Sequence, residues 1–256
     1  AVVSADATFA DVANVSMTGR MQTIGFGNVE DKVSQRSLDE SKEYDVSTSI
    51  NLGKMMPVKW GIELPMNYSI GEKFIDPKFD PQYQDVELSE VDAANLPSNL
   101  PRGTDVSRNY TKRRSISFIN VRKKRNIESS RKPKFYDIEN VSVSYSFNEE
   151  SHRDYNIEKA VSQNVNASAS YNFTFQPLFL EPFKKKQLFK SKYLQLIRDL
   201  NFNPIPTSLA INSRIDRSFN EQKSRNLVEG LTAQPTLRQR RFLFDWDYTV
   251  AFNFTK

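Results

Sequence analysis

Residues 165–175 read VNASASYNFTF, a stretch in which apolar and polar side chains alternate strictly. Every second residue from Val165 to Phe175 is apolar, and the residues between them are asparagine, serine and threonine. Because successive side chains of a strand point to opposite faces of a sheet, this pattern predicts a long strand with one apolar and one polar face.

The same alternation recurs along the chain. It is clear in IENVSVSYSF at 138–147 and in FLFDWDYTVAFNF at 242–254. Residues 5–26 read as one long strand with a bulge near Ala10 to Val12. Weaker copies predict four further strands, at 44–52, 58–70, 112–121 and 209–216. We therefore expect an all-β, antiparallel chain with about eight strands.

Strand length favours a membrane. Soluble strands usually have about five or six residues, whereas a strand that crosses a bilayer needs about nine to eleven. Strands in lipid must close into a barrel, because every backbone group needs a hydrogen-bond partner. The sequence thus predicts a segment of a transmembrane β-barrel with a water-filled interior. Its candidate lumen-facing residues are Asn140, Ser142, Ser144, Ser146, Asn166, Ser168, Ser170 and Asn172, and its candidate lipid-facing residues are Val141, Val143, Tyr145, Phe147, Tyr171, Phe173 and Phe175.

We expect residues 1–256 to form a single unit, with a long loop at 71–111 and a helix-containing connection at 176–204. Within that connection, 183–200 places apolar residues at helical spacing, which predicts a short amphipathic helix. Strand parity predicts that four long polar connections share one end of the barrel, the extracellular one: 27–42, 71–111, 149–160 and 221–240.

The sequence offers little for catalysis or metal binding. It has no cysteine, and a single histidine, His152, cannot build a multi-histidine site. The basic run at 112–134 lacks any nucleic-acid-binding motif, so we expect a solvated loop or a contact with anionic lipid head groups. We expect no enzyme activity, no cofactor, no metal and no nucleic-acid partner.

Two other function classes fit the alternation. A smaller outer-membrane solute channel would need the barrel to close within a chain of this length. A soluble β-sandwich, acting as a binding module or adhesin, would bury its apolar faces between two sheets. Short serine, asparagine and threonine side chains on the polar face favour a barrel over a sandwich, since they leave the bore free.

Five phrases of the sequence are distinctive: TFADVANVSMTGRMQTIGFG (8–27), LGKMMPVKWGIELPMNYSIGEKFIDPKFDPQYQDVEL (52–88), YNFTFQPLFLEPFKK (171–185), NFNPIPTSLAINSRIDRSFNEQKSRNL (201–227) and RRFLFDWDYTVAFNFTK (240–256). They resemble the SprA family, also called Sov, the giant outer-membrane proteins of Bacteroidetes.

The resemblance implies the translocon of type 9 secretion, a very large single-chain barrel at the surface of a Gram-negative bacterium. Such a channel exports folded cargo that carries a C-terminal signal domain, and it supports gliding motility. The implied partners are outer-membrane lipid, a PorV-type shuttle barrel, a plug protein and the remainder of the barrel. Family members are many times longer than this chain, which predicts that it forms an arc of the barrel rather than a closed ring.

Overall fold

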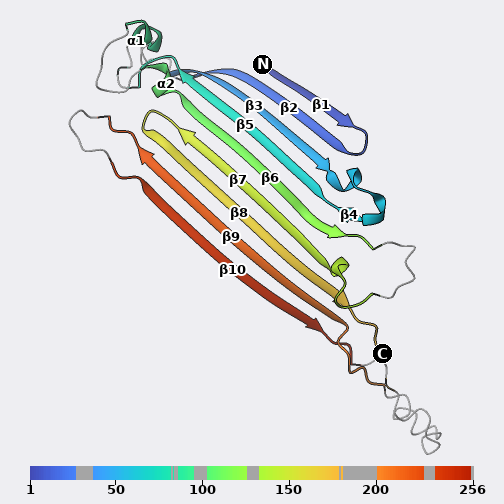
Figure 1. The fold of residues 1–256 in the computed structure, drawn as a ribbon. Helices are drawn as coiled ribbons and strands as arrows, with labels where there is room; N and C mark the ends of the chain where they lie inside the picture. Colours follow the sequence, from blue (N-terminus) through green and yellow to red (C-terminus); the bar gives the residue numbers. More distant parts are fainter. Residues whose placement is uncertain are drawn as a thin grey trace, which may run out of the picture.

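The computed structural model describes residues 1–26, 37–81, 83, 86–94, 103–125, 133–178, 180, 201–227 and 234–254. Within them the chain forms one antiparallel sheet of ten strands (Figure 1). The strands are β1 (Val2–Phe9), β2 (Ala13–Phe26), β3 (Ser37–Asn51), β4 (Ile62–Glu63), β5 (Pro65–Pro77), β6 (Asn109–Lys123), β7 (Val141–Arg153), β8 (Ile157–Thr174), β9 (Ser208–Ser224) and β10 (Leu237–Ala251). The helical elements are short: α1 (Leu88–Ala94), α2 (Thr104–Ser107), η2 (Leu52–Met55), η3 (Val58–Trp60) and η4 (Ile138–Asn140).

The sheet is a meander in which each main strand pairs with the next one along the chain. The order is β1-β2-β3-β5-β6-β7-β8-β9-β10, and the short β4 pairs with β6. Strands β1 and β10 are the two edges of this open sheet. The antiparallel all-β prediction is therefore confirmed, whereas closure into a barrel stays a prediction.

The strands lie in a single layer (Figure 1). Among the described residues, Leu88 is the only buried hydrophobic side chain, at 2% exposure. Large aromatic residues of β10 are open to the surroundings instead, with Trp246 64% and Tyr248 61% exposed. A soluble sandwich needs a second sheet to cover such a face, and the described part of the chain contains only one sheet.

Most predicted strand boundaries were wrong, because the strands extend further than the alternation: β3 begins at Ser37, β8 at Ile157 and β10 at Leu237, and β9 ends at Ser224. Three other predicted strands differ from the observed ones as well. Residues 5–26 form a hairpin of β1 and β2, because the chain reverses at Ala10, whose φ is 47°. The strand expected at 58–70 begins later, since Val58–Trp60 forms η3 and Gly61 takes a left-handed φ of 61°. The short strand expected at 112–121 is the fifteen-residue β6.

The ends of β2, β5, β7 and β9 lie at one end of the sheet with the starts of β3, β6, β8 and β10 and with α1 and α2, which agrees with the expected parity (Figure 1). That this end is extracellular stays a prediction. All four connections are shorter than expected: β3 extends into 27–42, β5 and β6 extend into 71–111, β7 and β8 extend into 149–160, and β9 and β10 extend into 221–240. The helix predicted at 183–200 lies outside the described residues.

Asn203 joins three segments at the opposite end of the sheet. It is 1% exposed, and its Oδ1 accepts hydrogen bonds from the backbone amides of Leu178 at 3.3 Å and Ile205 at 3.2 Å. Its Nδ2 donates to the backbone oxygen of Asn253 at 3.2 Å, and its own amide donates to that of Phe254 at 2.9 Å. This side chain therefore ties the β8–β9 connection to the residues that follow β10.

Within the described residues, no helix is both long enough and apolar enough to cross a membrane.

Candidate functional site

The strand register divides the sheet into two chemically distinct faces. We call the face that carries Ser144 and Ser146 the polar face, and the face that carries Val143 and Tyr145 the apolar face. Because the main strands are paired side by side, one residue of each strand joins a row across the sheet. One such row on the polar face runs Asp6, Ser16, Ser47, Ser69, Ser115, Asn148, Asn164, Ser218 and Arg241.

Hydroxyl groups bond to one another across the polar face. The Oγ atoms of Ser16 and Ser47 lie 2.6 Å apart, and those of Ser69 and Ser115 lie 2.7 Å apart. The polar face is also hollowed, by about 410 Å³ over β1 to β6 and about 530 Å³ over β6 to β9. Short hydroxyl and amide side chains thus line a concave surface, together with Asp6 in the first hollow and the Arg214–Asp216 ion pair in the second.

The structure brings together the predicted lumen-facing residues of β7 and β8. Ser142 lies opposite Ser170, Ser144 opposite Ser168, and Ser146 opposite Asn166, all on the polar face. The Oγ atoms of Ser142 and Ser170 are 2.6 Å apart. What this face contacts stays a prediction.

Asn140 does not belong to this set. It is the last residue of η4, one residue before β7 begins, so strand alternation does not orient it. Its Nδ2 donates to the backbone oxygens of Lys134 at 2.9 Å and Phe135 at 3.3 Å, inside the β6–β7 connection.

The predicted lipid-facing residues also share one face. Val141 lies opposite Tyr171, Val143 opposite Ala169, Tyr145 opposite Ala167, and Phe147 opposite Val165. Phe175 follows the end of β8, although its ring still packs edge-on against Phe173 at 4.8 Å between centroids. The hydroxyl of Tyr171 is engaged, because it donates to the backbone oxygen of Phe135 at 2.5 Å.

The apolar residues of this face form a strip across the strands, which we call the apolar band. On β8 it extends from Val165 to Phe173. One of its rows runs Phe9, Ala13, Ile50, Met66, Phe118, Tyr145, Ala167, Ile215 and Phe244.

Charged residues replace the apolar band toward the end of the sheet that carries α1 and α2. On β5 and β6 Lys112 Nζ lies 2.8 Å from Glu72 Oε1, and Tyr44 of β3 donates to the same carboxylate. On β6 and β7 Arg114 Nη2 lies 2.8 Å from Glu149 Oε1. Sequence reasoning missed these pairs, because cross-strand partners are set by register and not by spacing along the chain.

At the other end of the sheet, Glu63 of β4 binds two basic residues of the β6 segment. Arg122 Nε lies 2.6 Å from its Oε2, and Lys124 binds its other oxygen. Hydrogen bonds from Lys124 and then Arg122 hold the pKa of the Glu63 carboxyl below its ordinary value. Part of the basic run at 112–134 therefore has an acidic partner within the sheet.

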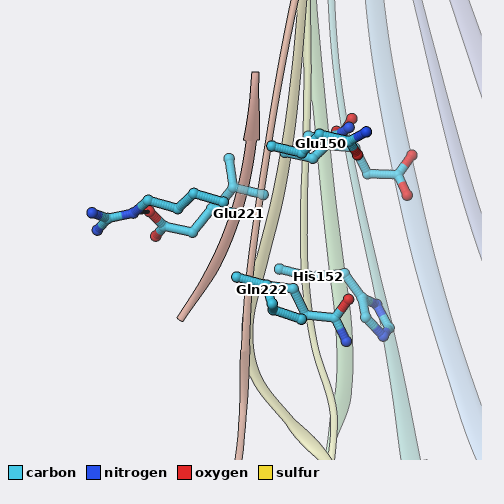
Figure 2. Close-up of a pocket in the computed structure, with 11 residues that line it drawn as sticks. Glu150, His152, Glu221 and Gln222 are labelled. Atoms are coloured by element: carbon cyan, nitrogen blue, oxygen red, sulfur yellow. Dashed lines mark hydrogen bonds and ion pairs between the residues drawn. The ribbon is translucent and has the colours of Figure 1, made fainter. Parts of the chain in front are cut away.

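His152 of β7 lines a hollow of about 510 Å³ together with residues of β8, β9 and β10 (Figure 2). Glu150, His152 and Gln222 point to one side of the sheet and Glu221 to the other, as the alternation requires (Figure 2). The His152 Nδ1 lies 2.9 Å from Thr111 Oγ1 and its Nε2 3.2 Å from Asp154 Oδ2. Among the described residues no cluster of three or more histidine, aspartate or glutamate side chains could hold a metal ion.

Residues 1–91 match a protein-family model, SprA_N, described as a motility related/secretion protein. The chain resembles the SprA family. The matched region contains β1 to β5 and the start of α1, so it covers the N-terminal part of the sheet. No curated protein matches the chain.

The SprA resemblance supports a role in motility or secretion for this chain, and such a role indicates the cell envelope or surface. The strands beyond residue 91 continue the same sheet with the same polar and apolar faces, because β6 to β10 extend the rows that begin on β1.

Proposed function

We propose that this chain forms part of the wall of an outer-membrane β-barrel that conducts folded proteins to the surface of a Gram-negative cell. The channel would be the translocon of type 9 secretion, and its cargo would include proteins needed for gliding motility. One observation carries the proposal: a single-layer sheet keeps a serine- and asparagine-rich face and an apolar face separate across its main strands.

The physics of the bilayer explains why these features belong together. A bilayer covers the apolar face with acyl chains, so no second protein layer is needed there. On the other face, water in the lumen forms hydrogen bonds with the hydroxyl and amide groups. The edges β1 and β10 still expose unpaired backbone groups in the open sheet. Further strands, the remainder of the barrel, would satisfy those groups in lipid.

The proposed channel performs no covalent chemistry. Its cargo would carry a C-terminal signal domain, and its partners would be outer-membrane lipid, a PorV-type shuttle barrel and a plug protein. The short, neutral side chains of β7 and β8 in the middle of the polar face suit a surface past which folded proteins move without strong binding.

The decisive test is a cysteine scan in the full-length protein, assembled in the outer membrane. Single cysteines replace Ser144 or Ser168 on the polar face, and Val143 or Tyr171 on the apolar face. A water-soluble maleimide that does not enter lipid should label the first pair and spare the second. Labelling of Val143→Cys and Tyr171→Cys, with Ser144→Cys and Ser168→Cys unreactive, would refute the assignment of the faces.

The size of the native polypeptide provides an independent test. An antibody against residues 201–227 should detect a band many times larger than 29.5 kDa in outer-membrane extracts. A detergent-dependent band at 29.5 kDa would instead indicate a small complete barrel and would contradict the translocon.

A further inference from the structure

The structure points to a binding site for the phosphate head group of a membrane lipid, formed by Arg217 and Arg240 on the apolar face of β9 and β10. This inference rests on the proposed function, because it requires that the apolar face meets lipid. It adds a specific ligand class, an anionic phospholipid, to a surface that otherwise needs only acyl chains.

The two arginines alternate with two phenylalanines at the border of the apolar band. Arg217 lies opposite Phe242, and Phe219 lies opposite Arg240. Arg217 and Arg240 are therefore diagonal neighbours on adjacent strands, with Cα atoms about 7–8 Å apart. A head group above them can contact both guanidinium groups while its acyl chain lies along Phe242 and Phe244.

The local charge balance leaves these two arginines available. Glu221 is shared between Lys159 at 2.9 Å and Arg238 at 2.8 Å, and its side chain is 12% exposed. Within the described part of the chain, neither Arg217 nor Arg240 has a carboxylate partner. On β5 to β7, by contrast, Lys112 and Arg114 of the same face each pair with a glutamate, Glu72 and Glu149 respectively.

The geometry of Arg240 suits an anion at the edge of the acyl region. Its guanidinium carbon lies 5.6 Å from the centroid of the Phe219 ring. Stacking on a ring holds the flat group in place and leaves its N–H donors free at the rim. Phosphate oxygens accept such charge-assisted hydrogen bonds, and a second guanidinium nearby adds to the attraction.

Photo-crosslinking in vesicles tests this site in the full-length protein. The vesicles contain phosphatidylcholine, with a trace of either photoactivatable phosphatidylglycerol or photoactivatable phosphatidylcholine in the acyl chain. Peptide mapping then measures the crosslinks to β9 and β10. We expect the anionic probe to exceed the zwitterionic probe in the parent protein. The double variant Arg217→Gln/Arg240→Gln should lower that ratio by about tenfold or more, because each basic residue near a membrane surface favours anionic lipid strongly.

Arg241→Gln is the matched control, because Arg241 is the next residue of β10 and lies on the polar face opposite Ser218. It should leave the ratio unchanged. Equal crosslinking of the two probes in the parent, or an equal loss in Arg241→Gln, would overturn the site while the channel proposal stands. Competition by inorganic phosphate at the concentration of the head groups would assign the site to a free anion and would also overturn it. Crosslinking by neither probe would instead refute the lipid-facing apolar band itself.

Discussion

Replacing Ala169 of β8 by arginine puts a charge in the middle of the apolar band. Ala169 lies opposite Val143 and Ser213, four residues from each end of the band at Val165 and Phe173. At about 3.4 Å per residue this is about 14 Å along the strand on either side. With a strand tilt of about 40°, the site lies about 10 Å inside each border. An arginine at that depth should lower the free energy of unfolding by about 2–4 kcal/mol.

Two controls isolate depth and face. Ser168→Arg changes the adjacent residue but on the polar face, so it should cost little. Gln163→Arg stays on the apolar face but lies beyond the band, where its amide now donates to Glu149 at 2.6 Å. That change should cost about 0–1 kcal/mol, since the penalty falls near the interface. The assay is urea unfolding of the full-length protein in lipid vesicles. A cost for Ser168→Arg equal to that for Ala169→Arg would refute the division into faces.

Three smaller changes test the ends of the sheet by the same urea titration. Asn203→Ala should lower stability by about 3 kcal/mol, because it leaves three partly buried backbone groups without their partner, each worth about 1 kcal/mol. An unchanged midpoint would show that Asn203 does not hold these segments together. The lowered pKa of Glu63 means that its ion pairs stabilise the protein above the unfolded-state pKa, and that this stability is lost as pH falls through the lower folded-state pKa. Glu63→Gln should therefore unfold earlier than the parent at about pH 7, and the difference should shrink as pH falls below the unfolded-state pKa of about 4.3. Gly53→Ala should cost about 1–3 kcal/mol, because its Cβ would lie 2.2 Å from the backbone oxygen of Ile62, whereas Gly19→Ala has nothing within 4 Å and should be tolerated.

Alternation in the sequence was enough to predict the strands with small polar residues. On β7 and β8, serines and asparagines separate apolar residues without a break, and the predicted faces match the register. Alternation failed where the polar residues are large and charged. In β6 both Arg113 and Arg114 are basic, so alternation does not show which of the two lies on the apolar face. The register does show it, because Arg114 lies opposite Glu149 and Arg113 lies opposite Glu150.

Turns without glycine or proline were the second cause of error. Ala10 and Asp11 form the β1–β2 turn, in which Ala10 has a left-handed backbone. Alanine rarely adopts that conformation, so the sequence does not indicate a hairpin at this point. The resulting strands still alternate, so the sequence reads as one strand with a slip. Asn140 failed for a related reason, since the alternation of β7 begins one residue after it.

The meander topology has a consequence for biogenesis. Apart from the two-residue β4, which pairs with β6, every strand hydrogen-bonds only to the main strands just before and just after it in the chain, so the main ladders do not wait for a distant segment. A nascent sheet of this kind can grow one hairpin at a time from an existing edge, and at each step the newest strand is the template for the next. Such a sheet can therefore assemble strand by strand from either edge, and an interruption at any strand leaves a paired sheet behind it.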